Sequence, residues 1–358
     1  MSVVASTLDP SGCSNLSSAA RWFLHSGIQE SDGGVARYYL AEPGRNARVS
    51  TEITSYAIST HLYLHRLTAD AAHLQAARHA GEFLAQAWDE QSSTMPFELP
   101  ARLAFFFDTG IVARGLLRLW RTTGDERFRQ RAERCAESML RDFRSGREIH
   151  PILELPAKSP ALRDARWSRQ PGCYQLKAAL AWLELGEATG RAEYRLVYDD
   201  AVRAALESHH DFLAGEGEGE RAMDRLHAYL YFLEGLLPKA REHRRAFEEA
   251  IHSAAACLRR TRSILERSDA CAQLLRLRLL AGIPVDEAAA EEEAAWCASY
   301  QDASDDPRRQ GGFWFGSRPS GRLPFINPVS TAFCAQALAW WHQRRRGAAP
   351  PLDWHDVI

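Results

Sequence analysis

The amino-acid sequence predicts an all-α fold, an (α/α)6 toroid in which six inner helices are ringed by six outer ones. Apolar residues recur at helical spacing over runs of about 15–20 residues, separated by short breaks rich in Gly, Pro and Asp. Similar breaks follow Thr68, Thr123 and Thr189, which indicates a repeated two-helix unit. Alternating strand patterns longer than about five residues are absent from the sequence.

The first pair of helices is expected in residues 51–67 and 71–88, each of which carries one apolar stripe. The same unit extends along the chain in six steps. First helices are expected to start near Thr51, Asp108, Gly172, Met223, Ser268 and Asn327. Second helices are expected to start near Ala71, Glu126, Ala192, Arg241 and Asp286, and an N-terminal helix near Ser17–His25 closes the ring.

The first helix of each pair is the more apolar, as in Ala178–Trp182 and Ala335–Trp341, which indicates that these helices form the inner ring. A plain α-solenoid is the alternative. The long and unequal loops argue against it, because solenoid repeats are regular. We expect a single domain over residues 1–358, with irregular ends at about 1–15 and 347–358.

The composition excludes several classes of protein. The chain has 358 residues, 46% hydrophobic and 25% charged, which is ordinary for a globular protein. Its net charge is −2, and no nucleic-acid partner is expected, because nucleic-acid binders usually carry a basic excess. No stretch approaches the roughly 20 apolar residues of a membrane span, and the first residues do not resemble a secretory signal.

The seven cysteines are far apart and form no C-x-x-C motif. Those at Cys135, Cys257 and Cys334 lie in apolar helical segments, which is typical of small buried thiols. A zinc site is the alternative, and the spacing does not favour it. We therefore expect no metal and no other cofactor, and reduced thiols indicate a cytoplasmic location.

The starts of the six predicted inner helices are polar and would all face one end of the ring. They would bring together Glu52, Asp108, Asp224, Asp269, Lys177, His227 and Arg267. Helix caps are the alternative for Ser50, Asp108, Ser268 and Asn327, and a satisfied core pair is the alternative for His227 and Tyr229. Several polar groups at equivalent positions inside helices favour a wet cavity, because they must find partners or face water.

Aromatic residues stand beside polar ones in the loops that precede these helices. Trp167 and Arg169 lead to Tyr174 and Gln175, and Trp314 has glycines on both sides. Aromatic rings beside polar groups suit a sugar, which offers a C–H face and a rim of hydroxyls. The alternative is that such rings fill the hole between the inner helices.

The available chemistry is acid–base work by carboxyl groups. Glycosidic hydrolysis usually needs two carboxyls, one of them protonated, about 5–9 Å apart. Burial near other acids raises a carboxyl pKa in the required direction. The sequence has no phosphate-binding loop, no G-x-S-x-G elbow, no H-E-x-x-H and no dinucleotide fingerprint, so nucleotide-dependent and serine-hydrolase functions are not expected.

Six segments resemble the bacterial exopolysaccharide-cluster proteins of the VpsJ type, over about residues 50–340. They are Phe107–Gly110, Trp167–Lys177, Met223–Tyr229, Glu266–Asp269, Gly311–Gly316 and Asn327–Phe333. The resemblance implies a role in polysaccharide biosynthesis. It implies no catalytic residue, because the family has no established reaction.

A broader resemblance is to six-hairpin glycosidases and sugar epimerases. Phe107-Asp-Thr-Gly110 is similar to the His-Asp-x-Gly segment of unsaturated glucuronyl hydrolases, which implies an acid–base role for Asp108. Those enzymes use a second Asp on the next inner helix, where this chain reads Gly172-Cys-Tyr-Gln-Leu-Lys177, so Asp224 would have to substitute. The N-acylglucosamine 2-epimerases use paired histidines, and His227 has no obvious partner in the sequence.

The sequence thus predicts a protein that binds an oligosaccharide or a glycolipid-linked sugar in an axial pocket and processes it as a glycosidase or an epimerase would. Asp108 is the expected acid or base, with Glu52, Asp224 or Asp269 as its partner. The expected binding residues are Trp167, Arg169, Tyr174, Gln175, Lys177, His227, Tyr229, Arg267, Trp314 and Asn327. The alternatives are a non-catalytic saccharide-binding or scaffold protein and, third, a zinc-dependent toroid of the lanthionine or prenyl type.

Overall fold

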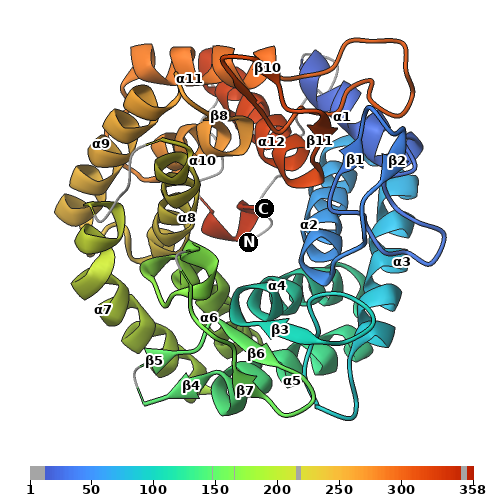
Figure 1. Ribbon diagram of the computed structural model, residues 1–358, viewed down its shortest axis with the longest axis vertical. Coiled ribbons are helices and arrows are strands. Elements are labelled where there is room, and N and C mark those ends of the chain that lie inside the picture. The colour runs from blue at the N-terminus through green and yellow to red at the C-terminus, as the bar shows by residue number, and fades with distance from the viewer. Residues whose placement is uncertain (1–12, 147, 165, 215–218, 348–352) are drawn as a thin grey trace.

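The computed structural model describes residues 13–146, 148–164, 166–214, 219–347 and 353–358, and twelve α-helices of these residues form a closed ring (Figure 1). The inner helices are α2 (Thr51–Thr68), α4 (Phe106–Thr123), α6 (Leu176–Thr189), α8 (Glu220–Leu236), α10 (Ser268–Leu280) and α12 (Pro328–Arg345). The outer helices are α1 (Ser14–His25), α3 (Ala71–Ala87), α5 (Glu126–Asp142), α7 (Ala192–Ala214), α9 (Arg244–Thr261) and α11 (Glu287–Ser299).

The ring confirms the predicted (α/α)6 toroid and its order of helices. Inner helices are apolar because they are covered on all sides, and every residue of α10 is buried. Outer helices bury one stripe only, such as Phe128, Ala132 and Cys135 of α5. The predicted starts lie within a few residues of the observed ones. The 3-10 turn Cys173–Gln175 delays α6, and the 3-10 turn Leu237–Lys239 follows α8.

The recurrent threonine breaks are the turns between an inner helix and its outer partner. After each threonine, a left-handed residue ends the inner helix, namely Ala69, Gly124 and Gly190. In two of these breaks the next residue is an aspartate that caps the outer helix, Asp70 for α3 and Asp125 for α5. The repeat in the sequence thus marks the places where an inner helix ends and its outer partner begins.

Short antiparallel strands form in the segments that precede five of the six inner helices, at the end of the ring where those helices begin. One sheet joins the segment before α2 to the segment before α12, because β1 pairs with β11, and so closes the ring. The strands are β1 (Tyr39–Leu40), β2 (Arg45–Asn46), β3 (Leu103–Phe105), β4 (Arg144–Ser145), β5 (Glu148–Ile149), β6 (Ile152–Glu154), β7 (Ser159–Pro160), β8 (Glu266–Arg267), β9 (Gly316–Arg318), β10 (Gly321–Arg322) and β11 (Phe325–Ile326).

The described C-terminal residues lie inside the ring. Residues 353–358 include the 3-10 turn Trp354–Asp356 and lie in the middle of the ring (Figure 1). Arg66 of α2 pairs with Asp356 at 2.6 Å, and Val357 and Ile358 are buried. Burial of these two apolar side chains explains why the segment is held inside the ring. Residues 1–12 and 348–352 fall outside the described residues.

The cysteines confirm the prediction of buried thiols, since all seven are buried. In the part of the chain that the structure covers, no helix is both long enough and apolar enough to cross a bilayer.

Candidate functional site

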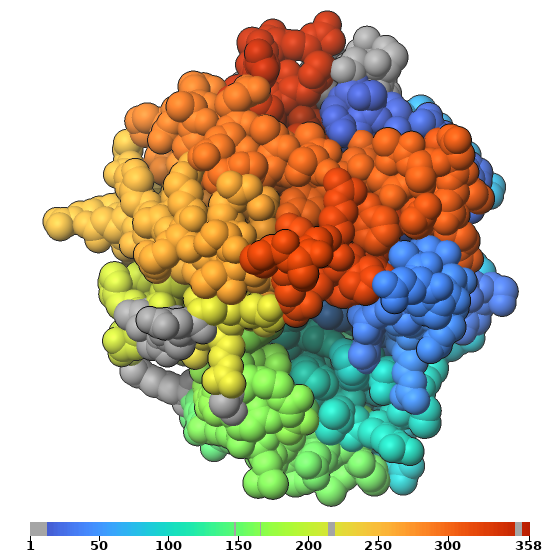
Figure 2. All heavy atoms as spheres, turned by 45° about the horizontal axis from the view of Figure 1, so that its top comes forward, coloured from blue at the N-terminus to red at the C-terminus, as the bar shows by residue number. Residues whose placement is uncertain are grey.

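The inner helices begin at one end of the ring, and Figure 2 shows that face from an angle. The surface is hollowed there between the orange-red segment before α12, the blue segment before α2 and the green and teal segments before α4 and α6 (Figure 2). We call this hollow the ring opening. Two clusters of charged side chains lie at it, one on α2 and α4 and the other on α8 and α10.

The first cluster is a pair of carboxyl groups in the first turns of adjacent inner helices, Glu52 of α2 and Asp108 of α4. Burial raises the pKa of Glu52 to about 7, although the charges of Lys177 and Arg37 oppose this rise. Burial, reinforced by the negative charge of Glu52, raises the pKa of Asp108 well above its usual range. Both carboxyls therefore hold a proton more readily than an exposed carboxyl does.

Asp108 is not the helix cap that the sequence left open as an alternative. Helix α4 begins two residues earlier, at Phe106, so Asp108 lies inside its first turn. Its side chain is 5% exposed, and its Oδ2 atom has no hydrogen-bond partner among the described residues. By contrast, Ser50 does cap α2, since its hydroxyl accepts from the N–H of Ile53.

Arg37 is the cation beside this pair, and the sequence analysis missed it. Its charge lowers the pKa of both Glu52 and Asp108. Its guanidinium lies 4.0 Å from the centre of the Phe97 ring and pairs with Glu98 at 2.9 Å. Arg37 precedes β1, far in sequence from any inner-helix start except that of α2, so no periodic pattern marks it. The segment Met95–Glu98, where Phe97 stands next to Glu98 in the loop before α4, is the part of the sequence that could have pointed to this place.

The segment before α6 lies against the same pair of carboxyls. The Tyr174 ring packs on Phe107 of α4, with centroids 6.2 Å apart, and edge-on against Trp167 at 5.0 Å. Its hydroxyl donates to the carbonyl of Gln170. Trp167 is half-buried, so part of its ring faces solvent. Arg169 of the 3-10 turn Trp167–Arg169 donates to the carbonyl of Leu162, which turns its charge toward the loop.

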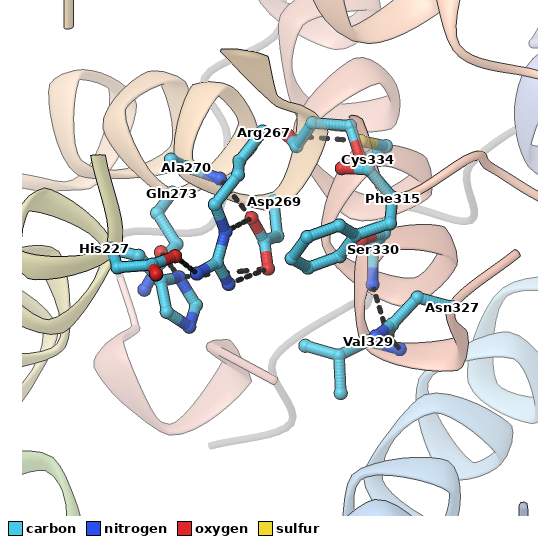
Figure 3. Close-up of polar contacts among 12 residues, drawn as sticks. His227, Arg267, Asp269, Ala270, Gln273, Phe315, Asn327, Val329, Ser330 and Cys334 are labelled. Atoms are coloured by element: carbon cyan, nitrogen blue, oxygen red, sulfur yellow. Dashed lines mark hydrogen bonds and ion pairs between the residues drawn. The ribbon is translucent and has the colours of Figure 1, made fainter. Parts of the chain in front are cut away.

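The second cluster is built around Arg267, which lies directly before α10 (Figure 3). Its guanidinium donates to both carboxylate oxygens of Asp269, at 3.0 and 2.7 Å, and to Asp224 of α8 at 2.7 Å. Although burial opposes ionisation, Arg267 holds the pKa of Asp269 below its usual range. Asp224 is 44% exposed. These two carboxylates are therefore ion-pair partners of one cation, and the lowered pKa of Asp269 does not suit a proton donor.

His227 belongs to this cluster and is held in one tautomer (Figure 3). Its Nδ1 lies 2.7 Å from Oε1 of Gln273, whose amide nitrogen donates to Glu234. The amide oxygen can only accept, so Nδ1 carries the proton and Nε2 does not. Burial, with the nearby charge of Arg267, lowers the pKa of His227 to about 4, so the ring is neutral at pH 7.

Tyr231 connects the two clusters and was also missed. Its ring lies 4.5 Å from His227 and 4.7 Å from Phe107. It stands one helical turn after His227 on α8, so the sequence spacing could have placed it on the same face. The sequence left open that aromatic side chains fill the space between the inner helices. Phe107 and Tyr231, which pack on each other, do so.

Three other predicted residues have structural partners in the described part of the chain. Tyr229 points to the outer layer, where its hydroxyl lies 2.9 Å from Nδ1 of His209, because two residues along a helix turn the side chain by about 200°. Trp314 is 8% exposed and donates its indole N–H to Asp302. Asn327 caps α12, accepting from the N–H groups of Val329 and Ser330.

Gln175 and Lys177 are also placed differently from the prediction. Gln175 lines a cavity of about 410 Å³ that lies off the axis, between α6, α7 and the β4–β5 hairpin. Lys177 is fully buried in the centre of the ring, where it pairs with Glu234 at 2.6 Å. It therefore lies beneath the opening and does not line it.

Over the ranges that the structure describes, no group of three or more His, Cys, Asp and Glu side chains lies close enough together to hold a metal ion. What the two clusters can do chemically is bind polar ligands and exchange protons.

The comparison with protein families finds no match, and the comparison with curated proteins finds none either. Solved structures do match. A cellobiose 2-epimerase from Spirochaeta thermophila has a TM-score of 0.71 at 14% identity, over 95% of this chain and 100% of that one. A D-mannose isomerase has a TM-score of 0.67 at 11% identity, over 94% of this chain and 99% of that one.

A third structure, of UGL with the saccharide dGlcA-Glc-Rha-Glc, has a TM-score of 0.64 at 14% identity, over 94% of this chain and 97% of that one. At such low identity these likenesses define the fold. The chain has the same (α/α)6 fold as these three structures, the six-hairpin glycosidase-like fold. The three structures carry the names of sugar-processing enzymes.

Proposed function

We propose that this protein processes a saccharide at the ring opening by carboxyl acid–base chemistry, with Asp108 as the proton donor and Glu52 as the carboxylate. The observation that carries the proposal is the pair itself. Two carboxyls of adjacent inner helices both have pKa values raised by burial, and the negative charge of Glu52 adds to the rise at Asp108. A protonated acid beside an ionised carboxylate is the arrangement that glycoside hydrolysis needs.

The surroundings of the pair suit a sugar. The charge of Arg37 acts on both carboxyls, and its guanidinium offers hydrogen-bond donors. Trp167, which packs edge-on against Tyr174 in the segment before α6, offers a partly exposed apolar face. The names of the structural neighbours support a saccharide substrate. The resemblance to VpsJ-type proteins supports a place in exopolysaccharide biosynthesis, and buried thiols suit the cytoplasm.

The test is a thermal-shift screen against neutral, N-acetylated and uronic sugars and their short oligomers. The parent protein is compared with Asp108→Asn, Glu52→Gln and a control, Asp200→Asn, whose carboxylate pairs with Arg203 on the outer helix α7. A ligand at 100 times its Kd adds about 2.7 kcal/mol of stability. We expect a hit that all four proteins bind, with product formed only by the parent and the control. Turnover by Asp108→Asn would contradict the proposal.

A second candidate, epimerisation, is favoured by the tautomer of His227. Its Nε2 is an unprotonated base at the ring opening, fixed by the 2.7 Å contact of Nδ1 with Gln273. Such a base can take the proton next to a sugar carbonyl. Loss of turnover in His227→Gln, with turnover kept in Glu52→Gln, would select this candidate. Binding without turnover of any sugar would select the non-catalytic saccharide-binding alternative.

A further inference from the structure

A cavity of about 410 Å³ lies off the axis of the ring, between the inner helix α6, the outer helix α7 and the β4–β5 hairpin (Figure 1). Its volume is within the range of about 300–1,000 Å³ that is typical of small-molecule sites. The carboxyls of the two charged clusters at the ring opening do not line it. The cavity is therefore separate from the site of the proposed saccharide chemistry.

The buried part of the cavity wall is apolar and uncharged. Its buried lining residues, apart from Gln175, are Cys173, Leu176, Trp182, Ala205 and Phe212. Phe212 is held at the wall by close packing on Gly172, where a Cβ atom would lie 2.7 Å from the Phe212 ring. An apolar wall with an aromatic side chain suits an apolar ring of a ligand.

The charged residues of the cavity lie toward solvent. Each is exposed or partly exposed, and both signs are present: Arg144, Glu148, Asp200, Asp211 and Arg225. Asp200 pairs with Arg203 at 2.9 Å, and the Arg225 guanidinium donates twice to the carbonyl of Phe212. Mixed and partly paired charges at the mouth give the buried space no counter-ion, so an ionic ligand would lose its hydration there without compensation.

The amide of Gln175 also lines the cavity, and it is the feature that points to a ligand. Gln175 is 4% exposed, and its Nε2 atom has no hydrogen-bond partner among the described residues. The residue ends the 3-10 turn Cys173–Gln175 directly before α6, and its own backbone N–H donates to the carbonyl of Gly172. A buried donor without a partner is unfavourable, so an acceptor placed in the cavity would be bound by it.

We propose that this cavity binds a small uncharged compound that has an apolar ring and an acceptor oxygen, which takes a hydrogen bond from Nε2 of Gln175. The apolar wall receives the ring, and the Gln175 amide fixes the orientation of the oxygen. The inference goes beyond the proposed function, because it concerns a second site and does not depend on sugar chemistry at the ring opening.

The experiment measures the Kd of three probes for the full chain by ligand-observed NMR. Acetophenone has the ring and the carbonyl oxygen, ethylbenzene has the ring without the oxygen, and benzoate has the ring with a charge. Gln175→Met removes the amide and keeps an unbranched side chain. Ala201→Phe places a ring in the cavity from α7. Ala192→Phe is its control, since Ala192 is an exposed residue of the same helix that does not line the cavity.

We expect the parent protein and Ala192→Phe to bind acetophenone, and Gln175→Met to bind it about tenfold more weakly, because one hydrogen bond is lost. Binding of ethylbenzene should be as strong in Gln175→Met as in the parent, and Ala201→Phe should bind neither compound. The inference would be overturned if the parent does not bind acetophenone, if Gln175→Met binds it equally well, or if Ala201→Phe still binds it. Tighter binding of benzoate than of acetophenone would show an anion site and would overturn the inference as well.

The stability of the ligand-free variant gives a second test. Because Nε2 of Gln175 has no partner in the described protein, Gln175→Met should unfold at the same Tm as the parent or at a higher one. A lower Tm, or a failure to fold, would show that the amide already serves the structure and would overturn the inference. The saccharide screen at the ring opening is independent, so its failure would reject the proposed function and leave this site in place.

Discussion

Arg267 and Asp269 are joined by two hydrogen bonds, from Nε at 3.0 Å and from Nη2 at 2.7 Å, across a single residue of chain. The same guanidinium also binds Asp224 at 2.7 Å. One cation thus holds one carboxylate that is 3% exposed and another that is 44% exposed. The two aspartates allow a matched test of what burial does to an ion pair.

We expect Asp269→Asn to destabilise the protein by about 3–5 kcal/mol, because it leaves a buried guanidinium with a weakened partner. Asp224→Asn should cost less than about 1 kcal/mol, because water screens an exposed pair. Denaturant unfolding of both variants at pH 7 measures the difference. Equal losses would show that Asp269 is no more important than Asp224 in holding Arg267.

Glu52→Gln should become more stable than the parent as the pH rises. Burial raises the pKa of Glu52 to about 7 in the folded protein, from 4.5 for an unperturbed glutamate. Between these values the folded state binds more protons than the unfolded state, so the parent loses stability as the pH increases from 4.5 to 7. The loss is at most about 3 kcal/mol. Thermal unfolding at pH 5 and pH 8 measures it, and a pH-independent difference between the two proteins would contradict the raised pKa.

The buried pair of histidines between α2 and α3 should weaken the protein in acid. Nδ1 of His61 lies 2.9 Å from Nδ1 of His73. Burial lowers their pKa values to about 3 and about 4, so both are neutral when folded. Below pH 6.5 the unfolded state binds more protons, and stability falls as the pH drops toward 4. The expected loss at pH 5 is about 2 kcal/mol for each histidine.

The test replaces both rings, as His61→Phe with His73→Leu, because a single change would strand the other nitrogen. The double variant should lose less stability between pH 7 and pH 5 than the parent does. His252→Gln, an exposed change on α9, serves as the control and should follow the parent. If the double variant and the parent lose equal stability, the histidines are not the acid-sensitive groups.

Asn327→Ala should lower stability without changing saccharide binding. The side chain accepts from two N–H groups at the start of α12, and loss of such a cap costs about 1 kcal/mol. Asn327→Asp keeps the acceptor and should stay near the parent. Denaturant unfolding measures the cost, and the saccharide screen measures binding. If Asn327→Asp loses ligand binding, the Asn327 side chain takes part in binding as well as in capping.

Local signals in the sequence were enough to predict the helices. Apolar spacing sets which face of a helix is buried, and the breaks at Thr68 and Thr123 end one helix and cap the next through Asp70 and Asp125. The toroid was predicted because the sequence contains six pairs of helices. The short strands were not predicted, because segments of two or three residues carry no period, and their pairing depends on neighbours brought close by ring closure.

The site was predicted only in outline. The sequence pointed to Glu52 and Asp108, which lie at equivalent positions of successive inner helices. It could not assign both Asp224 and Asp269 to an ion-pair role, because Arg267, which lies two residues before Asp269, is brought to Asp224 only by the packing of α8 beside α10. Tyr229 was placed on the wrong face of α8.

The sequence by itself determined the number, order and buried faces of the helices, because helical period and caps depend on residues close together in the chain. The tertiary structure decided which polar groups meet. Arg37 acts on the carboxyl pair from the segment before α2, and Lys177 of α6 is buried against Glu234 of α8. Charges interact through space, so the closed ring, and not the order of residues, sets the ionisation of Glu52 and Asp108.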